Sequence, residues 1–286
     1  MGQIIKGKPV ADKLTENVIK EVEMLKNEGM YPKLKIIRVG ENAEDLAYEK
    51  GALNRMNKCG IDCQVIQLPK EINQEDFLCQ IKKANDDPDC HGILVFRPLP
   101  HQIDEEVVKH FINPKKDIDC FSQLNVAKVV DGDCTGFPPA TPSAVMEILK
   151  YYQVDVAGKH AVVIGRSMVV GKPVSMLLLN ENATVTICHS KTKGLKEICK
   201  QGDILIAAVG RAKMVDINYL KEGAVVIDVG INVDDQGNLC GDVDFDSCLS
   251  KVSMITPVPQ GVGAVTTSVL AKHVVKACKK LSTNGH

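Results

Sequence analysis

The stretch from Gly158 to Pro173 reads GKHAVVIGRSMVVGKP, and it predicts the fold of the half of the chain around it. Its apolar run, residues 161–164, is short, rich in β-branched side chains and followed by a glycine, which is typical of a buried parallel strand. The amphipathic segment after Pro173 predicts a helix with proline in its first turn. A glycine turn between strand and helix gathers backbone N–H groups at one point, where a phosphate can bind.

The spacing of this turn is not the usual dinucleotide fingerprint. Gly165, Ser167 and Gly171 give G-x-S-x-x-x-G, which is one residue longer than G-x-G-x-x-G. Taken alone, such a turn is more typical of an ordinary strand-to-helix connection than of a cofactor site.

A second predicted strand, Thr184–Cys188, strengthens the case for a cofactor. In NAD-binding folds an acidic residue near the end of this strand binds the ribose 2′-hydroxyl. Here the strand is followed by HSKT, residues 189–192, without a carboxylate, and Arg166 lies on the first turn. Hydroxyl and cationic side chains suit a 2′-phosphate, so the sequence favours NADP over NAD.

Two further apolar runs, Asp203–Val209 and Ala224–Val229, are each followed by a glycine. Four such runs predict a doubly wound parallel sheet, that is, a Rossmann-like α/β domain. The first part of the chain predicts a second α/β layer. Its predicted strands are 34–39, 63–68 and 92–95, and its predicted helices are 11–28, 42–58 and 74–85.

Irregular segments indicate the domain boundaries. Residues 117–141, rich in Gly, Pro, Asp and Asn, are predicted to be an irregular link, and a final helix from residue 265 to about 281 is predicted to return to the first domain. We therefore expect a first domain of residues 1–140, completed by 265–286, and a second domain of residues 141–264. Two crossings of the chain between domains predict a cleft, where ligands commonly bind.

Composition excludes several partners. The 35 basic and 36 acidic residues balance, so nothing favours nucleic acid or an anionic membrane. The N-terminal sequence lacks the apolar core of a signal peptide, and no apolar run reaches membrane-spanning length. The eleven cysteines are scattered without metal-ligand spacing, which favours core thiols in a reducing compartment over disulfides or zinc. We therefore expect a cytoplasmic protein without a metal site.

Short motifs along almost the whole chain resemble those of the methylenetetrahydrofolate dehydrogenase/cyclohydrolase family. They are Pro98-Leu99-Pro100, Lys116-Asp117-Ile118-Asp119, Thr141-Pro142, Gly165-Arg166-Ser167 with Gly171-Lys172-Pro173, His189-Ser190-Lys191-Thr192, Asp228-Val229-Gly230-Ile231-Asn232, Gly241-Asp242-Val243, and Thr256-Pro257-Val258-Pro259 with Gly261-Val262-Gly263. Their number and order make the resemblance far more specific than any single motif.

The resemblance implies an activity. The family oxidises 5,10-methylenetetrahydrofolate with NAD(P)⁺ and then hydrolyses the methenyl product to 10-formyltetrahydrofolate. Tetrahydrofolate derivatives are therefore the implied substrates, in one-carbon metabolism and purine biosynthesis, and the implied assembly is a homodimer.

The resemblance also implies roles for individual residues. The catalytic set is Tyr48 and Asp119 from the family pattern, with Lys50 added as the candidate replacement for the family lysine. The substrate-binding set is Tyr48, Pro98, Leu99, Asp119, Pro259 and Gly261 from the family pattern, with Arg97 added as a cation expected to enter the cleft. The cofactor-binding set is Thr141, Gly165, Arg166, Ser167, Gly171, Pro173, Ser190, Gly230 and Ile231, where Gly230 is expected to let the backbone approach the nicotinamide. Without the resemblance, Asp119 is as well explained as a turn cap and Tyr48 as a packing residue.

The predicted folate side departs from the family at two side chains tied to hydrolysis. The family has a lysine four residues after its tyrosine, where this chain has Ala52, and its glutamine before the Pro-Leu-Pro motif is replaced in Phe96-Arg97. Water attack on the methenyl cation needs proton transfer, whereas hydride transfer needs mainly alignment. We therefore expect the dehydrogenase step to persist and the cyclohydrolase step to be weakened or altered, with Lys50 ranked slightly ahead of Arg97 as the replacement.

Two other functions stay open from the sequence. The first is a non-catalytic NADP-binding protein, which the retention of Tyr48 and Asp119 opposes. The second is a dehydrogenase for another small cyclic substrate, which is the weaker competitor.

Overall fold

The structure is a computed structural model that describes residues 2–283 of the chain. The chain folds as two compact units. The six-stranded unit comprises Pro139–Thr266 and the N-terminal stretch through Asp12. The three-stranded unit comprises Lys13–Pro138 and the C-terminal stretch from Thr267. The boundaries given above, 1–140 and 141–264, place the N-terminal stretch differently and stay a prediction.

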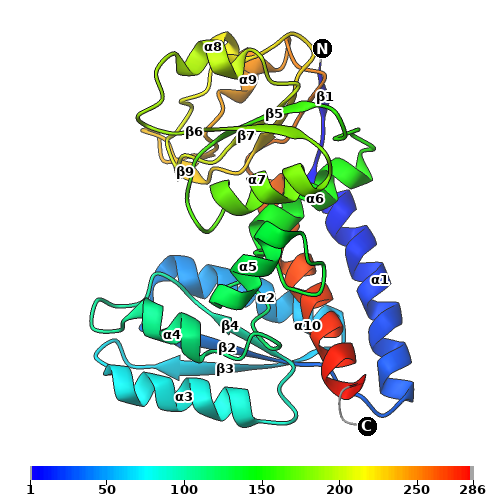
Figure 1. Cartoon of the computed structure of the whole chain (residues 1–286), viewed down its shortest axis with the longest axis vertical. Coiled ribbons are helices and arrows are strands. Elements are labelled where there is room, and N and C mark those ends of the chain that lie inside the picture. Colours follow the sequence, from blue (N-terminus) through cyan, green and yellow to red (C-terminus); the bar gives the residue numbers. More distant parts are fainter. Residues whose placement is uncertain (1, 284–286) are drawn as a thin grey trace. The chain divides into compact units, whose positions relative to one another are not determined.

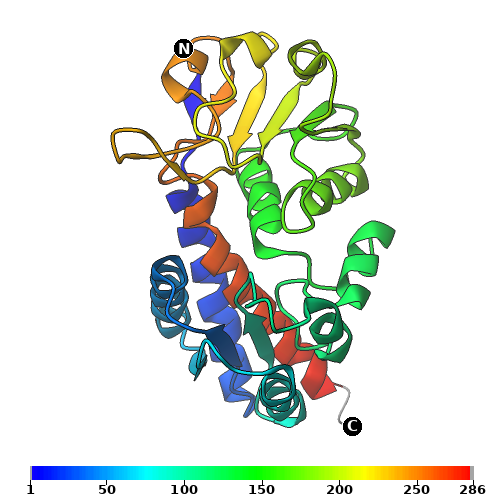
Figure 2. The same ribbon diagram turned by 90° about the vertical axis from the view of Figure 1, so that its left-hand side faces the viewer.

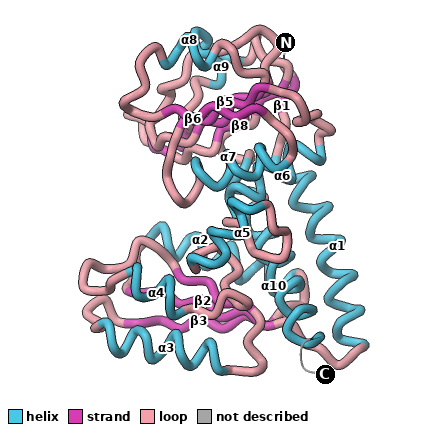
Figure 3. The backbone as a smooth tube through the Cα atoms, viewed as in Figure 1, coloured by secondary structure: helices cyan, strands magenta, loops and turns pink. Residues whose placement is uncertain are grey.

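One parallel sheet is the basis of the six-stranded unit (Figure 3). Its strand order is β1-β11-β8-β7-β5-β6. The strands are β5 (His160–Ile164), β6 (Thr184–Cys188), β7 (Ile204–Ala207), β8 (Val225–Asp228), β11 (Met254–Ile255) and β1 (Gln3–Ile4). β6 and β7 lie on opposite sides of β5, so the winding direction reverses there and the sheet is doubly wound. The α/β fold predicted from the four apolar runs is confirmed.

Helices and a short antiparallel strand pair complete this unit. They are α6 (Ala140–Tyr151), α7 (Gly171–Asn180), α8 (Leu195–Cys199), η1 (Ile217–Tyr219), β9 (Asn232–Val233), β10 (Leu239–Cys240), α9 (Phe245–Cys248) and η2 (Val262–Ala264). Aliphatic side chains from four strands, Val162, Leu205, Val226 and Ile255, are buried in one core cluster. Because both faces of a parallel sheet are covered, its strands are apolar throughout, which is why the sequence shows them as continuous runs.

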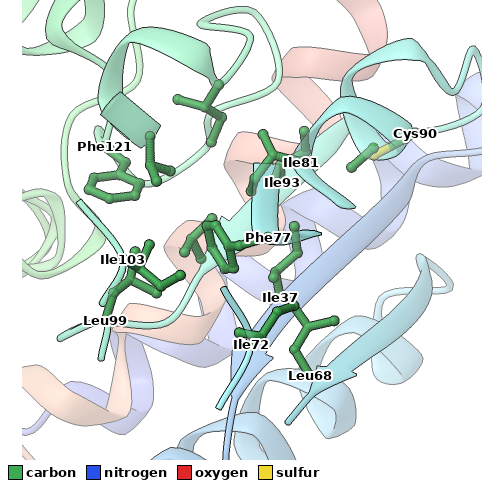
Figure 4. Close-up of a cluster of buried hydrophobic side chains, with 14 residues drawn as sticks. Ile37, Leu68, Ile72, Phe77, Ile81, Cys90, Ile93, Leu99, Ile103 and Phe121 are labelled. Carbon is green, nitrogen blue, oxygen red and sulfur yellow. The ribbon is translucent and has the colours of Figure 1, made fainter. Parts of the chain in front are cut away.

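The three-stranded unit has a parallel sheet of order β3-β2-β4 (Figure 1). The strands are β2 (Lys33–Val39), β3 (Asp62–Leu68) and β4 (Gly92–Val95). Its helices are α2 (Ala43–Lys58), α3 (Gln74–Asp86), α4 (Glu105–Phe111), α5 (Gln123–Asp131) and most of α1 (Gly7–Asn27) and α10 (Thr266–Thr283). Figure 4 shows Phe77 and Ile81 of α3 lying against Ile37 and Ile93 of the sheet.

The long helices α1 and α10 run side by side in this unit (Figures 1 and 2). A buried contact of 3.4 Å between the hydroxyls of Thr15 and Ser268 links them. The predicted amphipathic helix at residues 11–28 and the predicted final helix are both confirmed, with ends that differ by a few residues.

One structural prediction is wrong. Residues 117–141 were expected to be irregular, but they contain the helix α5. A serine and a glycine of this segment cap the helix. Ser122 accepts a hydrogen bond from the backbone N–H of Asn125, and Gly132 ends the helix with φ of 71°.

The sequence also gives no strand at its N-terminus, yet β1 pairs in parallel with β11 at the edge of the large sheet. Only two residues form this strand, which is too short for an alternation pattern to be recognised.

Candidate active site

Backbone contacts explain the two glycines of the predicted phosphate turn. Gly165 has φ of 135°, and a Cβ added there would lie 2.2 Å from the carbonyl oxygen of Ala208. A Cβ added at Gly171 would lie 2.2 Å from the carbonyl oxygen of Gly165. The turn after β5 is therefore clamped between the start of α7 and the segment after β7. These strand ends flank the reversal point of the sheet, where such folds bind ligands.

The start of α7 keeps the geometry predicted from the sequence. Ser167 Oγ accepts hydrogen bonds from the backbone N–H groups of Val170 and Gly171, at 3.1 and 3.4 Å. Pro173 is buried in the first turn, and Arg166 is exposed on the same loop. The Ser167 hydroxyl thus organises the helix start, and the exposed cation beside it suits an anionic ligand.

The tip after β6 has no acidic side chain to meet a ribose hydroxyl. Thr192 Oγ1 accepts a hydrogen bond of 2.8 Å from the backbone N–H of His189, which fixes the turn. Ser190 is exposed between these two residues. A hydroxyl, a histidine and lysines at this position fit a 2′-phosphate better than a 2′-hydroxyl.

Gly230 also has a structural reason to be glycine, and its expected approach to the nicotinamide stays a prediction. A Cβ added there would lie 2.3 Å from Cγ of Asp242, so a buried carboxylate already requires glycine at this position. The adjacent Ile231 is 68 % exposed, and Thr141 is half-buried in the first turn of α6.

Asp228, at the end of β8, is 3 % exposed. Burial raises the pKa of this carboxyl group to about 6, although backbone N–H donors oppose the shift. Asp228 and Asp242 lie in motifs of the resemblance, but no sequence pattern predicted a role for either residue.

In the three-stranded unit, aromatic and charged side chains from three segments meet. The ring centroids of Tyr48, on α2, and Phe96, just after β4, are 5.6 Å apart. Arg97 places its guanidinium 4.8 Å from the ring centre of Phe121 and its Nη2 atom 3.8 Å from a carboxylate oxygen of Asp119. The side chains of Arg97 and Asp119 are 20 % and 26 % exposed, so both can meet a ligand. Tyr48, Arg97 and Asp119, which were predicted from the sequence as site residues, thus lie in one region of this unit.

A buried aspartate holds the loop that carries Asp119. The carboxylate of Asp117 accepts hydrogen bonds from the backbone N–H groups of Phe121 and Ser122 and from Nδ2 of Asn125, at 2.8–2.9 Å. Asp117 is 1 % exposed. It has the turn-capping role that the sequence allowed for Asp119, which leaves the carboxylate of Asp119 partly open to solvent.

The carbonyl of Ile118 in the same loop meets Nδ1 of His273 on α10 at 2.8 Å. Burial lowers the pKa of His273 to about 4, so the imidazole is neutral at pH 7.

Helix α2 carries Ala52, the position at which the resemblance places the family lysine, and Lys50, its expected replacement. Ala52 is fully buried, whereas Lys50 is exposed. One turn further along, Arg55 donates a 2.7 Å hydrogen bond to the hydroxyl of Thr15 and a 3.4 Å bond to that of Thr267. Arg55 therefore joins α2 to both long helices and has a structural task.

The residues of the Pro-Leu-Pro motif differ in their burial. Pro98 is exposed, whereas Leu99 belongs to the core cluster of Figure 4, and its backbone N–H donates to a carboxylate oxygen of Glu105 at 3.0 Å. We find that Leu99 supports the loop through packing.

The two predicted substrate residues of the last loop, Pro259 and Gly261, follow β11 in the six-stranded unit. Pro259 is exposed. A Cβ added at Gly7 would lie 2.1 Å from the carbonyl oxygen of Gly261, so the start of α1 approaches this loop backbone to backbone.

Two other features are absent from residues 2–283. In this range no three His, Cys, Asp or Glu side chains are grouped to hold a metal ion. No described helix is both long and apolar enough to cross a membrane.

A doubly wound sheet with a glycine turn at its reversal point is the arrangement in which many enzymes of the nicotinamide-dependent dehydrogenase class bind their dinucleotide. The comparisons with known proteins specify the family. Residues 139–282 match the tetrahydrofolate dehydrogenase/cyclohydrolase NAD(P)-binding domain, and residues 5–119 match the catalytic domain of the same family. The chain belongs to the tetrahydrofolate dehydrogenase/cyclohydrolase family, as the resemblance in its motifs predicted.

Curated relatives match over nearly their whole length. The bifunctional protein FolD of Clostridioides difficile (strain 630) is 64 % identical over 278 residues, which cover 97 % of each chain. The bifunctional protein FolD of Alkaliphilus oremlandii (strain OhILAs) is 62 % identical over 279 residues, 98 % of each chain.

Solved structures agree. The Campylobacter jejuni bifunctional FolD methylenetetrahydrofolate dehydrogenase/cyclohydrolase has a TM-score of 0.96 at 39 % identity, covering 98 % of this chain and 99 % of its own. The Trypanosoma brucei enzyme, complexed with NADP cofactor and inhibitor, has a TM-score of 0.92 at 35 % identity, covering 98 % of each chain.

Proposed function

We propose that this chain oxidises 5,10-methylenetetrahydrofolate with NADP⁺ and hydrolyses the 5,10-methenyl product to 10-formyltetrahydrofolate. The observation that carries the proposal is the position of Asp119 beside Arg97 and the aromatic side chains of the three-stranded unit. A carboxylate next to aromatic faces suits a planar pterin ring with hydrogen-bond donors on its edge. Relatives that match over the full length, named as bifunctional enzymes, support both activities.

The six-stranded unit fits the cofactor. The Gly165 turn and the start of α7 offer backbone N–H groups to a pyrophosphate, and Arg166 with Ser190 offers a cation and a hydroxyl to a 2′-phosphate. When bound, NADP⁺ supplies the hydride acceptor. We propose that the remaining cofactor contacts come from Thr141, Ser167, Gly171, Pro173, Gly230 and Ile231.

For the oxidation step, the chain needs to bind and align the folate. We propose that Asp119 accepts paired hydrogen bonds from the 2-amino group and the N3–H of the pterin, and that Tyr48 stacks on the ring. The lone pairs of the two nitrogens that flank the methylene carbon stabilise the cation left by the hydride. No protein base is required, so the alanine at position 52 does not impair this step.

The hydrolysis step needs a group that moves a proton from the attacking water. Ala52 carries none, and Lys50 is the first candidate to replace the family lysine. Arg97 is the second, although a guanidinium stays protonated and can only stabilise charge. We propose that hydrolysis is retained but slower than oxidation.

Absorbance of the methenyl cation during turnover tests both steps. We expect formation of NADPH together with a transient accumulation of methenyltetrahydrofolate. If Lys50 is the proton carrier, Lys50→Ala should lower the rate of hydrolysis relative to the rate of oxidation by about 10²- to 10⁴-fold. More methenyltetrahydrofolate should then accumulate. Arg97→Leu, at the second candidate position, is the matched comparison. A wild-type protein that binds NADPH but forms none from the folate would support the non-catalytic alternative instead.

We further propose that the enzyme acts as a homodimer in the cytoplasm and supplies one-carbon units for purine synthesis, without a nucleic-acid or membrane partner. Analytical ultracentrifugation at micromolar concentration tests the assembly. A single species of about 31 kDa would refute the dimer.

A further inference from the structure

Two buried carboxylates lie at the carboxyl edge of the large sheet, and the reaction as described above assigns them no task. Asp228 ends β8, and Asp242 follows β10. They are 3 % and 0 % exposed. A buried carboxylate is costly unless hydrogen bonds satisfy it, so its partners indicate what it organises.

The carboxylate of Asp242 binds the segment that follows β7. It accepts hydrogen bonds from the backbone N–H groups of three consecutive residues, Val209, Gly210 and Arg211, at 2.6, 3.1 and 2.8 Å. Nδ2 of Asn232 donates a fourth bond of 2.9 Å. One side chain thus fixes both the loop after β7 and the loop after β8.

Asp228 in turn fixes Asp242. Its Oδ1 accepts bonds from the backbone N–H groups of Gly230 and Asp242, both at 3.0 Å. Its Oδ2 accepts a 2.9 Å bond from Val243. A Cβ added at Gly241 would lie 1.8 Å from Oδ2 of Asp228, so the backbone passes against this carboxylate without room for a side chain.

The segment held by Asp242 forms one side of the candidate cofactor turn. Residue 208, immediately before it, is the one whose carbonyl oxygen would meet a Cβ at Gly165. The backbone N–H of Ala208 also donates to the carbonyl of Ile164 at 2.8 Å, just before that turn. A shift of residues 209–211 would therefore change the space at the reversal point of the sheet.

We infer that Asp242 is a positioning residue for cofactor binding, which sets the backbone of residues 209–211 against the Gly165 turn, and that Asp228 holds Asp242 in place. The inference rests on the proposed use of NADP. Because neither aspartate lies on the folate side, loss of either should weaken binding of the cofactor and leave the Michaelis constant for the folate nearly unchanged.

The test compares Asp242→Asn with a matched aspartate of the same sheet. An asparagine side chain keeps the shape but presents an NH₂ group to N–H donors. Asp203 also accepts a backbone N–H, from His160 at 2.9 Å, and a 2.6 Å bond from Lys221 Nζ, but it lies at the amino edge. We expect Asp242→Asn to weaken NADPH binding by roughly 10- to 100-fold. The fluorescence of the nucleotide measures this affinity. Asp203→Asn should leave NADPH affinity within about 2-fold of wild type.

A milder variant covers the case in which Asp242→Asn does not fold. Asn232→Ala removes one donor to Asp242 and leaves its backbone bonds intact, and it should weaken NADPH binding by about 2- to 5-fold. Unchanged NADPH affinity in the folded variant, or equal weakening by Asp203→Asn, overturns the inference. A wild-type protein that does not bind NADPH overturns the proposed function as well.

Discussion

The six-stranded unit and the three-stranded unit build their candidate sites from different parts of the chain. The first uses backbone N–H groups, closely packed glycines and buried carboxylates, as at Gly165 and Asp242. The second uses side chains that extend from α2, from the end of β4 and from the loop that contains Asp119.

The difference bears on the two departures from the family at side chains tied to hydrolysis, both of which lie in the three-stranded unit. In the six-stranded unit a single added methyl group meets backbone, so the motifs have little freedom to change. By the resemblance described above, Ala52 and Phe96 of the three-stranded unit replace a lysine and a glutamine, and both are buried within the α/β framework. Chemistry carried by side chains can be replaced without refolding, whereas chemistry carried by the backbone cannot.

Gly165→Ala is the substitution expected to have the largest effect. The new Cβ would meet the carbonyl oxygen of Ala208 at 2.2 Å and impose a strained φ. NADPH affinity should fall by more than about 100-fold, and unfolding free energy by about 1–3 kcal/mol. Gly158→Ala is the control, because it has a positive φ of 72° but no atom within 4 Å of the new Cβ. Similar losses of NADPH affinity in both variants would show that backbone strain alone matters.

Asp119→Ala tests the side-chain site. We expect folate turnover, as kcat/KM, to fall by about 10²- to 10³-fold, because a charged hydrogen-bond acceptor for the pterin is lost. NADPH affinity should stay near the wild-type value, since the carboxylate belongs to the other unit. Asp117→Asn should instead reduce thermal stability, given its three buried bonds. Near-normal folate kinetics in Asp119→Ala would leave that residue a surface carboxylate.

Arg166→Ala should reduce the preference of the enzyme for NADP⁺ over NAD⁺. The exposed guanidinium is expected to meet the 2′-phosphate, so the KM for NADP⁺ should rise by roughly 10-fold while that for NAD⁺ changes little. Steady-state kinetics with both cofactors measures the ratio. Equal use of NAD⁺ and NADP⁺ by the wild-type protein would contradict the cofactor assignment.

The pH dependence of stability should have opposite signs in the two units. The pKa of Asp228 is raised from 3.8 to about 6, so its folded form binds protons more tightly and its stabilising contribution is lost as the pH rises through about 6. The pKa of His273 is lowered from 6.5 to about 4, so its contribution is lost as the pH falls through the same range. Each shift corresponds to about 3 kcal/mol.

Hydrogen exchange at pH 4.5 and 6.5 can follow each unit separately. Asp228→Asn should flatten the pH dependence in the six-stranded unit and His273→Gln that in the three-stranded unit. A change in the pH dependence of exchange in the other unit instead would contradict this prediction.

The sequence predicted the elements that have strong local patterns. The β-branched run at residues 161–164 and the proline in the first turn of α7 were sufficient to place β5 and its glycine turn. Helix α5 was missed because its capping residues, Ser122 and Gly132, are of the same types that mark loops.

The sequence predicted which residues belong to the candidate site, but it did not predict which of them contact one another. The pairing of Arg97 with Asp119 depends on β4 and the following loop lying side by side, which spacing along the chain does not show. The role of Asp242 depends on backbone N–H groups of a segment about 30 residues earlier. Acceptors for distant backbone donors leave no periodic signal in a sequence.

The pairing of β1 with β11 has a consequence for synthesis of the protein. Gln3 pairs with Met254, so the first strand leaves the ribosome long before its partner exists. At typical translation rates the delay is roughly 12 to 50 s. Thr15 similarly meets Ser268, near the end of the chain. The six-stranded unit therefore cannot be completed before residue 266 is made, and the three-stranded unit needs α10 as well, so both units close only late in synthesis.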